Sequence, residues 1–359
     1  MDKMFIAIDG FFERFEKRMG KPMTVLVIGA FFLLLSMLIS ETRFETIHHG
    51  NAFTRLSEHP FGSENANDLR LRILSPLVGY LLFFRGIAFK YFMLIVLAVF
   101  FGLIYHFQRK NKLRPSESLG ISAICVFSTL AFYQLFFPAY TDPMSFLLML
   151  LLLYNYEKPY VATLLLSLML FNHENTLFIF PFFFLLMLQS DFSMRNLIRT
   201  ALKFAIALIP WIIYRKIILS HEEIEYTASY YFDPNNLNWT KDHVLPHLAS
   251  GVFQAFRLSW IFPLAAIVIN IYEKRYSEVL LIIVAIVFVL SQLIIAYDIS
   301  RLTGMAFPII ILSALRMRSY LGSRKFLLMI YAVVLINFFI PSYCIGALEP
   351  ISYAPSWMK

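Results

Sequence analysis

The sequence predicts an all-α membrane protein that crosses the bilayer about 11 times. Of its 359 residues, 59% are hydrophobic and only 15% are charged, whereas soluble domains carry about 25% charged residues. The mean hydropathy is +0.68, and apolar stretches long enough to span a membrane recur along the chain. The net charge of +8 is explained by basic residues that flank membrane spans, so it does not indicate a nucleic-acid partner.

The chain begins with a predicted interfacial helix over residues 1–22. Acidic and basic residues lie on one side of this helix. Apolar residues recur at helical spacing on the other side: Phe5, Ile8, Phe11, Phe12 and Phe15. The first span covers about 23–40, and no small-residue cleavage site follows it. We therefore expect a retained helix and not a signal peptide.

A long polar loop, about 41–89, follows the first span. Within it, residues 73–84 form an apolar stretch of about 12 residues, which is too short to cross roughly 30 Å of hydrocarbon and predicts a membrane-lying helix. The ten further predicted spans are about 90–108, 118–138, 142–156, 159–172, 174–189, 199–217, 257–272, 278–297, 302–316 and 325–345. Residues 23–345 thus form one integral domain with a second outer loop at 218–256 and an outer tail at 346–359.

The distribution of basic residues predicts the orientation. With the N-terminus in the cytoplasm and the C-terminus outside, the inner segments hold 19 of the 31 Lys and Arg residues. Six of the remaining basic residues lie in the opening loop region: Arg43, Arg55, Arg70, Arg72, Arg85 and Lys90. This excess on the outer side points to a binding site there.

The other outlying polar residues fall on the same predicted outer face. Charges at membrane depth are costly and are therefore candidates for function. The candidates are Glu41, Glu45, His48, His49, Arg70, Arg72, Asp142, His173, Glu174, Asp298 and Arg301.

Several short motifs along the chain carry a family resemblance. They are Arg-x-Leu-x-Pro at 72–76, Thr-Asp-Pro at 141–143, a His173-Glu174 junction ahead of Pro181, and Asp298-x-x-Arg301. With a retained first helix and a long outer loop, their order resembles the bacterial branch of the GT-C membrane glycosyltransferases. The resemblance implies a GT-C fold, an inner-membrane location and sugar transfer from a polyprenyl-phosphate donor on the outer face. The first loop offers Glu41 and Glu45 where the superfamily more often has Asp.

The chemistry of such a transfer assigns provisional roles. Arg70, Arg72 or Arg301 would hold the donor phosphate through bidentate, charge-assisted hydrogen bonds. The acceptor, a glycan, lipid or protein hydroxyl, needs a carboxylate base, for which Glu45 is the first choice, Glu41 the second and Glu174 the third. A single displacement would invert the anomeric centre. Asp142, His173, Asp298, His48 and His49 complete the predicted substrate site.

Each candidate also has a purely structural interpretation. Glu45 fits a solvated loop acid, Arg72 a side chain that reaches the interface, and Asp142 a helix cap before proline. Asp298 and Arg301 are three residues apart and fit an ion pair on one helix face. Two other function classes also stay open: a transporter or flippase, and a polysaccharide polymerase or ligase that uses arginines of the outer loops.

The sequence gives little support for a metal site. His173-Glu174 begins like a zinc-protease motif, but Leu177 occupies the position of its second histidine. His48 and His49 are adjacent and would point in different directions on a helix. We therefore predict no protein-held metal, and a divalent cation at the donor phosphate is the one cofactor left open.

Overall fold

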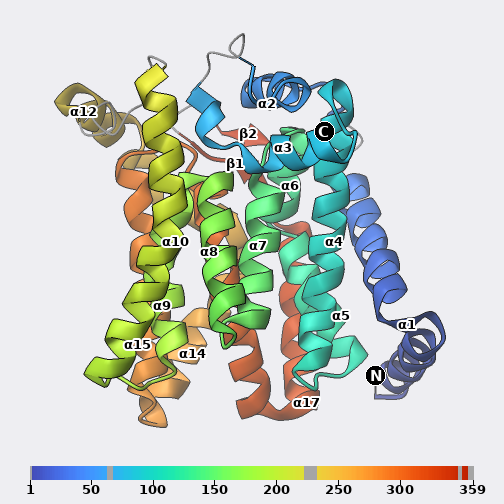
Figure 1. The fold of residues 1–359 in the computed structure, drawn as a ribbon. Coiled ribbons are helices and arrows are strands. Elements are labelled where there is room, and N and C mark those ends of the chain that lie inside the picture. The colour runs from blue at the N-terminus through green and yellow to red at the C-terminus, as the bar shows by residue number, and fades with distance from the viewer. Residues whose placement is uncertain (1, 63–67, 222–232, 347–349, 355–359) are drawn as a thin grey trace.

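The computed structural model of the chain describes residues 2–62, 68–221, 233–346 and 350–354. Figure 1 shows a bundle of long helices with the N-terminus at its lower end and the C-terminus at its upper end. The α-helices are α1 (Asp2–Ile39), α2 (His49–Glu58), α3 (Leu74–Leu81), α4 (Phe89–Lys110), α5 (Pro115–Val126), α6 (Thr129–Phe136), α7 (Asp142–Asn155), α8 (Pro159–Asn172), α9 (Phe180–Leu188), α10 (Met194–His221), α12 (Pro234–His243), α13 (Leu248–Phe256), α14 (Ile261–Tyr272), α15 (Tyr276–Ser291), α16 (Ile299–Thr303) and α17 (Phe307–Phe339).

Short 3-10 helices and one small sheet complete the described structure. The 3-10 helices are η1 (Asp68–Leu71), η2 (Gly86–Ala88), η3 (Glu174–Ile179), η4 (Leu245–His247), η5 (Arg257–Trp260), η6 (Gln292–Ile294) and η7 (Gly304–Ala306). The strands β1 (Tyr343–Cys344) and β2 (Ile351–Ser352) pair in antiparallel fashion.

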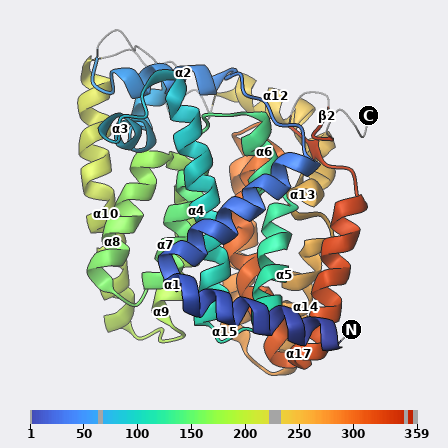
Figure 2. The same ribbon diagram turned by 90° about the vertical axis from the view of Figure 1, so that its right-hand side faces the viewer.

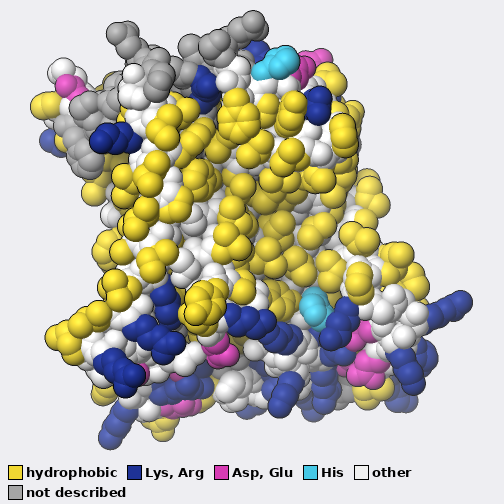
Figure 3. All heavy atoms as spheres, viewed as in Figure 1, with side chains coloured by type: hydrophobic (Ala, Val, Ile, Leu, Met, Phe, Trp, Pro, Cys, Tyr) yellow, Lys and Arg dark blue, Asp and Glu magenta, His cyan; other side chains and the backbone are white. Residues whose placement is uncertain are grey.

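The described helices confirm an all-α membrane protein but do not confirm eleven spans. Six helices are long and apolar enough to cross a membrane, or seven if α5 and α6, which meet at 46°, form one bent span. At 1.5 Å per residue, α7 and α8, of 14 residues each, reach only about 21 Å. Figure 3 shows hydrophobic side chains covering the middle of one face, with Lys and Arg gathered at the lower end.

Two long helices are broken at glycines with nearly identical backbone angles. In α1 the break is at Gly20 (φ 71°, ψ 167°), and Figure 2 shows the preceding segment lying across the lower end of the bundle. In α17 the break is at Gly322 (φ 73°, ψ 166°), between the segments expected as spans 302–316 and 325–345. Glycine adopts this positive φ without the steric cost that a Cβ would add.

The second segment of α1 packs closely against α4. A Cβ at Gly29 would overlap the carbonyl oxygen of Ala98, and a Cβ at Gly102 would overlap that of Val25. Paired small residues of this kind let two helix backbones approach each other in a membrane. The first predicted span is therefore fixed to the second through backbone contact.

Arg257 ties together the ends of two helices, α5 and α17, inside the bundle. Its side chain is buried, with a relative exposure of 2%, and it donates hydrogen bonds to the carbonyls of Phe127, Asn337 and Ile340. Phe127 ends α5 and Ile340 ends α17, where backbone carbonyls lack intrahelical partners. A single guanidinium thus supplies the donors that these two helix ends require.

The C-terminal hairpin fastens the upper end of the molecule. The Ser300 amide donates to the carbonyl of Ile345 (3.0 Å), and the Ile345 amide donates to the hydroxyl of Ser300 (3.1 Å). The Glu41 amide donates to the carbonyl of Tyr353 (2.7 Å), and the Tyr353 ring is fully buried. The end of the chain therefore holds both the start of the first loop and α16.

Candidate functional site

The first half of the candidate site is an ion pair between Arg72 and Glu174. Arg72 lies between η1 and α3, and Glu174 opens η3, 102 residues later. The Arg72 Nη2 lies 2.6 Å from Glu174 Oε1, and the Arg72 Nε lies 3.1 Å from Glu174 Oε2. The guanidinium therefore donates hydrogen bonds to both carboxylate oxygens. Such a bidentate pair fixes the orientation of both groups as well as their separation.

The neighbouring His173 is buried beside this pair. Its Nδ1 accepts a hydrogen bond from the Asn175 amide (3.2 Å) and lies 3.7 Å from Glu174 Oε2. An accepting Nδ1 carries no proton, so the imidazole is neutral in this arrangement. His173 therefore helps to shape the turn into η3 without adding positive charge beside Arg72.

The second half of the site is centred on Arg301. Its Nε lies 3.0 Å from Asp142 Oδ2, and its Nη1 lies 2.9 Å from Asp298 Oδ2. Arg301 lies in α16, Asp142 opens α7, and Asp298 immediately precedes α16. Arg301 and Asp142 are nearly enclosed, whereas the Asp298 side chain is 40% exposed. The most accessible carboxylate of the site is therefore that of Asp298.

Two tyrosines enclose the Arg301 guanidinium. It lies 5.3 Å from the ring centre of Tyr133 and 5.1 Å from that of Tyr140, within the range of cation–π attraction. The Tyr133 hydroxyl donates to Asp298 Oδ2 at 3.4 Å. The ring of His49 meets that of Tyr140 edge to face, with centroids 5.8 Å apart. Helix α2 in the first loop thereby reaches the same site.

His49 connects the two ion pairs electrostatically. Desolvation by the surrounding protein, followed by the positive charges of Arg301 and Arg72, lowers the pKa of His49 from 6.5 to about 4. Tyr140 also contacts both His49 and the guanidinium of Arg301, which places the ring beside the second half of the site. We call Arg72, Glu174, Asp142, Asp298 and Arg301 the paired-charge cluster.

Asn172 holds together the helix ends that carry the cluster. Its Nδ2 donates to the carbonyl of Thr141 (2.9 Å) and to the hydroxyl of Ser145 (2.7 Å), and its Oδ1 accepts from the hydroxyl of Ser75. This buried amide joins the end of α8 to the start of α7 and to α3. Asp142 follows Thr141 directly, and Glu174 lies two residues after Asn172, so both acids are positioned by one side chain.

Four sequence candidates are not joined to the cluster by the contacts described. Glu41 lies 3.2 Å from the Arg43 Nε, and Glu45 is exposed in the loop that precedes α2. Arg70 is buried, and its Nη2 is directed at the carbonyl of Phe61 at 3.5 Å. His48 has a positive φ of 48°, and its ring is 6.4 Å from that of Phe137. The role of Glu45 as a base stays a prediction.

Sequence reasoning did not identify several polar side chains that build the site, among them Ser75, Tyr133 and Asn172. A signal was present for two of them, because Asn172 directly precedes His173 and Ser75 lies within the Arg72–Pro76 motif. Tyr133 lies in an apolar stretch and gives no such signal. Among the residues that the structure describes, no group of three or more His, Cys, Asp or Glu side chains could hold a metal ion.

Comparison with known proteins adds no assignment to this geometry. No family model, curated protein or solved structure matches the chain. The interpretation of the site therefore depends on its own residues.

Proposed function

We propose that the chain is a membrane glycosyltransferase that moves a sugar from a polyprenyl-phosphate donor to an acceptor hydroxyl at the upper end of the molecule. The observation that carries the proposal is the paired-charge cluster. Residues that are up to 229 positions apart, Arg72 to Arg301, gather between helix ends at one end of an apolar bundle. Charges that are nearly enclosed within a membrane protein usually serve its substrate.

The proposed orientation puts the cluster on the extracytoplasmic side of a bacterial inner membrane. Lys and Arg gather at the lower end of the face in Figure 3, where the N-terminus also lies in Figure 1. Cytoplasmic ends of membrane proteins carry such an excess of basic residues. The upper end, with the cluster and the C-terminus, would then face outward.

Arg72 and Arg301 are the proposed phosphate ligands. A guanidinium that grips a carboxylate in bidentate fashion matches a phosphate in the same way. In the structure both arginines are already paired, so a donor phosphate would displace carboxylate oxygens from them. The displaced carboxylate would then be free to act on the acceptor beside the same phosphate.

Asp298 is the cluster residue best placed to act as the base. Its carboxylate is the most exposed of the three, whereas Glu174 is held on both oxygens by Arg72. In the proposed step the acceptor hydroxyl loses its proton to the carboxylate, and its oxygen bonds to the anomeric carbon. The bond from that carbon to the phosphate oxygen breaks, and its electron pair leaves with the polyprenyl phosphate. The anomeric centre is inverted.

The proposal is tested by assaying sugar transfer in lipid nanodiscs from a panel of radiolabelled polyprenyl-phosphate sugars. We expect Asp298→Asn to bind donor but to lower turnover about 10²-fold or more, which is the usual contribution of a general base. Arg72→Lys keeps the charge but removes the fork geometry, so it should weaken donor binding. Glu278→Gln, which alters a half-buried carboxylate paired with Arg275 far along the chain from the cluster, should leave transfer unchanged.

Two outcomes would redirect or end the proposal. If Asp298→Asn is fully active and Glu45→Gln is inactive, the base lies in the first loop, as the sequence predicts. If the wild-type protein neither binds nor consumes any donor in the panel, the glycosyltransferase proposal fails. Transport of a polar substrate would then be the better hypothesis.

A further inference from the structure

Helix α10 presents an apolar stripe to its surroundings. Its most exposed large residues recur every three or four positions: Ile198, Leu202, Ile206, Ile209, Ile213 and Ile217. This spacing places them along one side of the helix. A side of this kind, on a helix long enough to span a membrane, is suited to contact with lipid acyl chains.

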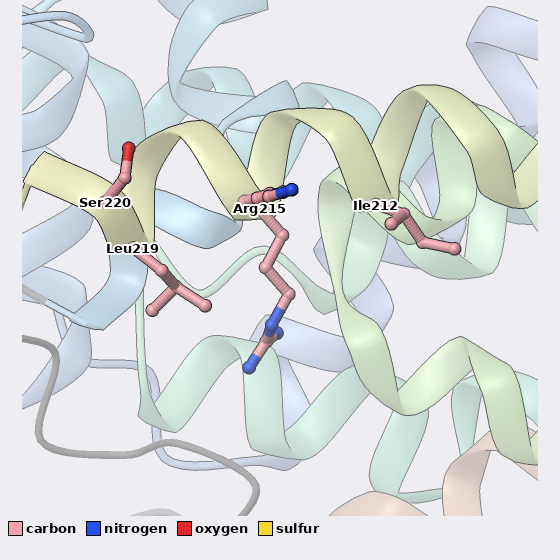
Figure 4. Close-up of a pocket in the computed structure, with 5 residues that line it drawn as sticks. Ile212, Arg215, Leu219 and Ser220 are labelled. Carbon is pink, nitrogen blue, oxygen red and sulfur yellow. The ribbon is translucent and has the colours of Figure 1, made fainter.

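A groove lies at the upper end of this stripe. It is a shallow, open groove formed by side chains of α10 alone: Ile212, Arg215, Lys216, Leu219 and Ser220 (Figure 4). The side chains of Arg215 and Leu219 project to the same side of α10 in Figure 4. The groove therefore combines two cations with apolar walls.

The two cations of the groove are not used by the ion pairs found elsewhere in the described structure. Arg215 has its guanidinium 5.4 Å from the ring centre of Trp211. Within the described ranges, neither Arg215 nor Lys216 forms an ion pair with a carboxylate. Lys216 lies next to the apolar stripe, whereas Arg215, two residues from both Ile213 and Ile217, lies on another side of the helix.

We propose that this groove binds the headgroup phosphate of an anionic phospholipid whose acyl chains lie along the exposed apolar surface of α10. Arg215 offers paired N–H donors that match phosphate oxygens, and Lys216 adds a compact positive charge. Ile212 and Leu219 supply apolar walls that a soluble anion would not use. The combination of charge and apolar surface therefore selects a lipid over a free phosphate ion.

The groove is also connected to the loop that bears Arg72. The hydroxyl of Tyr214, the neighbour of Arg215, donates to the backbone carbonyl of Arg70 at 2.8 Å. A lipid bound to Arg215 would therefore restrain the part of α10 that positions this loop. The proposed binding does not depend on which reaction the paired-charge cluster performs.

Native mass spectrometry of the purified full chain tests the proposal, with phosphatidylglycerol and phosphatidylcholine titrated separately. We expect the wild type to retain phosphatidylglycerol more strongly than phosphatidylcholine. The variant Arg215→Gln/Lys216→Gln should bind phosphatidylglycerol roughly tenfold more weakly, because each basic residue near a charged lipid adds to the attraction. The difference should shrink as ionic strength rises.

A matched control lies on the same helix. Arg195 and Arg199 are exposed near the lower end of α10, so Arg195→Gln/Arg199→Gln removes the same charge from a place without the groove. This control should bind phosphatidylglycerol like the wild type. Lys216→Gln alone, an exposed change that is compatible with folding, should give a smaller loss.

Equal losses in the two double variants would show that net charge alone attracts lipid and would overturn the proposal. Equal retention of phosphatidylglycerol and phosphatidylcholine by the wild type would overturn it as well. Full retention of phosphatidylglycerol by the Arg215→Gln/Lys216→Gln variant would show that the groove is not the site.

Discussion

Asn172 donates a hydrogen bond of 2.7 Å to the hydroxyl of Ser145, across the interface between α8 and α7. The same amide donates to the carbonyl of Thr141, and all three residues are buried. A buried amide with several partners holds its helices in one relative position, because any shift leaves polar groups unpaired. The hydrogen bonds of Asn172 therefore fix the distance between Asp142 and Glu174.

Replacing Asn172 by Ala should destabilise the protein by about 2–4 kcal/mol, because it leaves buried partners without hydrogen bonds and removes packed atoms. The measurement is unfolding of the purified protein in mild detergent with increasing sodium dodecyl sulfate. Asn155→Ala is the control, since the Nδ2 of Asn155 bonds only to the Leu151 carbonyl in its own helix. Equal effects of the two changes would contradict the role given to Asn172.

A double-mutant cycle on Arg72 and Glu174 should reveal strong coupling. Arg72→Gln and Glu174→Gln each leave a partly enclosed charge without its partner, whereas the double variant removes both charges. We expect a coupling free energy of about 1–3 kcal/mol, measured by the same unfolding method.

The comparison pair for this cycle is Arg275 and Glu278, which are three residues apart with side chains 45% and 33% exposed; Glu278 Oε2 also lies 3.8 Å from Arg316 Nε. Its coupling should be no more than about 0.5 kcal/mol, as is usual for exposed pairs on a helix. Coupling of the Arg72–Glu174 pair that is no larger than this would mean that the ion pair is incidental.

The titration of His49 provides a test of the charge around the site. Because its pKa is lowered to about 4, the ring should stay neutral at pH 7 and protonate only in acid. In the unfolded chain it takes up a proton near pH 6.5, so stability from this group is lost as the pH falls from about 6.5 to 4. Nuclear magnetic resonance of labelled histidines, with His49→Gln for assignment, measures the value directly.

The same titration in Arg72→Gln should give a higher pKa for His49, since one of the charges that lower it is gone. A His49 that titrates near 6.5 in the wild type would show that solvent and not the cluster controls the ring. An unchanged value in Arg72→Gln would separate His49 from the first ion pair.

The close approach of α1 and α4 predicts a steep cost for small enlargements. Gly29→Ala and Gly102→Ala should each lower stability by about 1–3 kcal/mol, because the added methyl overlaps a backbone carbonyl that cannot move alone. Thermal unfolding followed by size-exclusion chromatography reports the change. Gly10→Ala is the control, because its Cβ would meet only the end of the Arg14 side chain, and it should be neutral or stabilising.

The sequence predicted all five charged residues that the cluster contains, and the reason is energetic. Charges are so costly in an apolar bundle that Asp142, Glu174 and Arg301 were conspicuous without any structure. Glu45 was conspicuous for a different reason, its place in a polar loop, where acids need no partner. Tyr133 carried no signal, because aromatic residues are common in membrane helices whether or not they contact a charge.

The number of spans was harder to predict than their existence. Hydropathy identifies apolar stretches but does not show whether 14 residues such as α7 or α8 cross the bilayer or stop within the protein. The bend between α5 and α6 could not be predicted from the sequence either. It leaves the carbonyl of Phe127 without a partner in its own helix, and the hydrogen bond to that carbonyl comes from Arg257, 130 residues later. Such long-range partners are not encoded in any local pattern.

The Asp142–Arg301 and Arg72–Glu174 ion pairs can form only after the later partner of each pair has been synthesised. Asp142 is synthesised 159 residues before Arg301, and Arg72 is synthesised 102 residues before Glu174. At ordinary elongation rates Asp142 waits roughly 8 to 30 seconds for its partner. Through that interval the growing chain carries an uncompensated acid next to its apolar helices. Water or a proton therefore has to stabilise Asp142 until α16 is made.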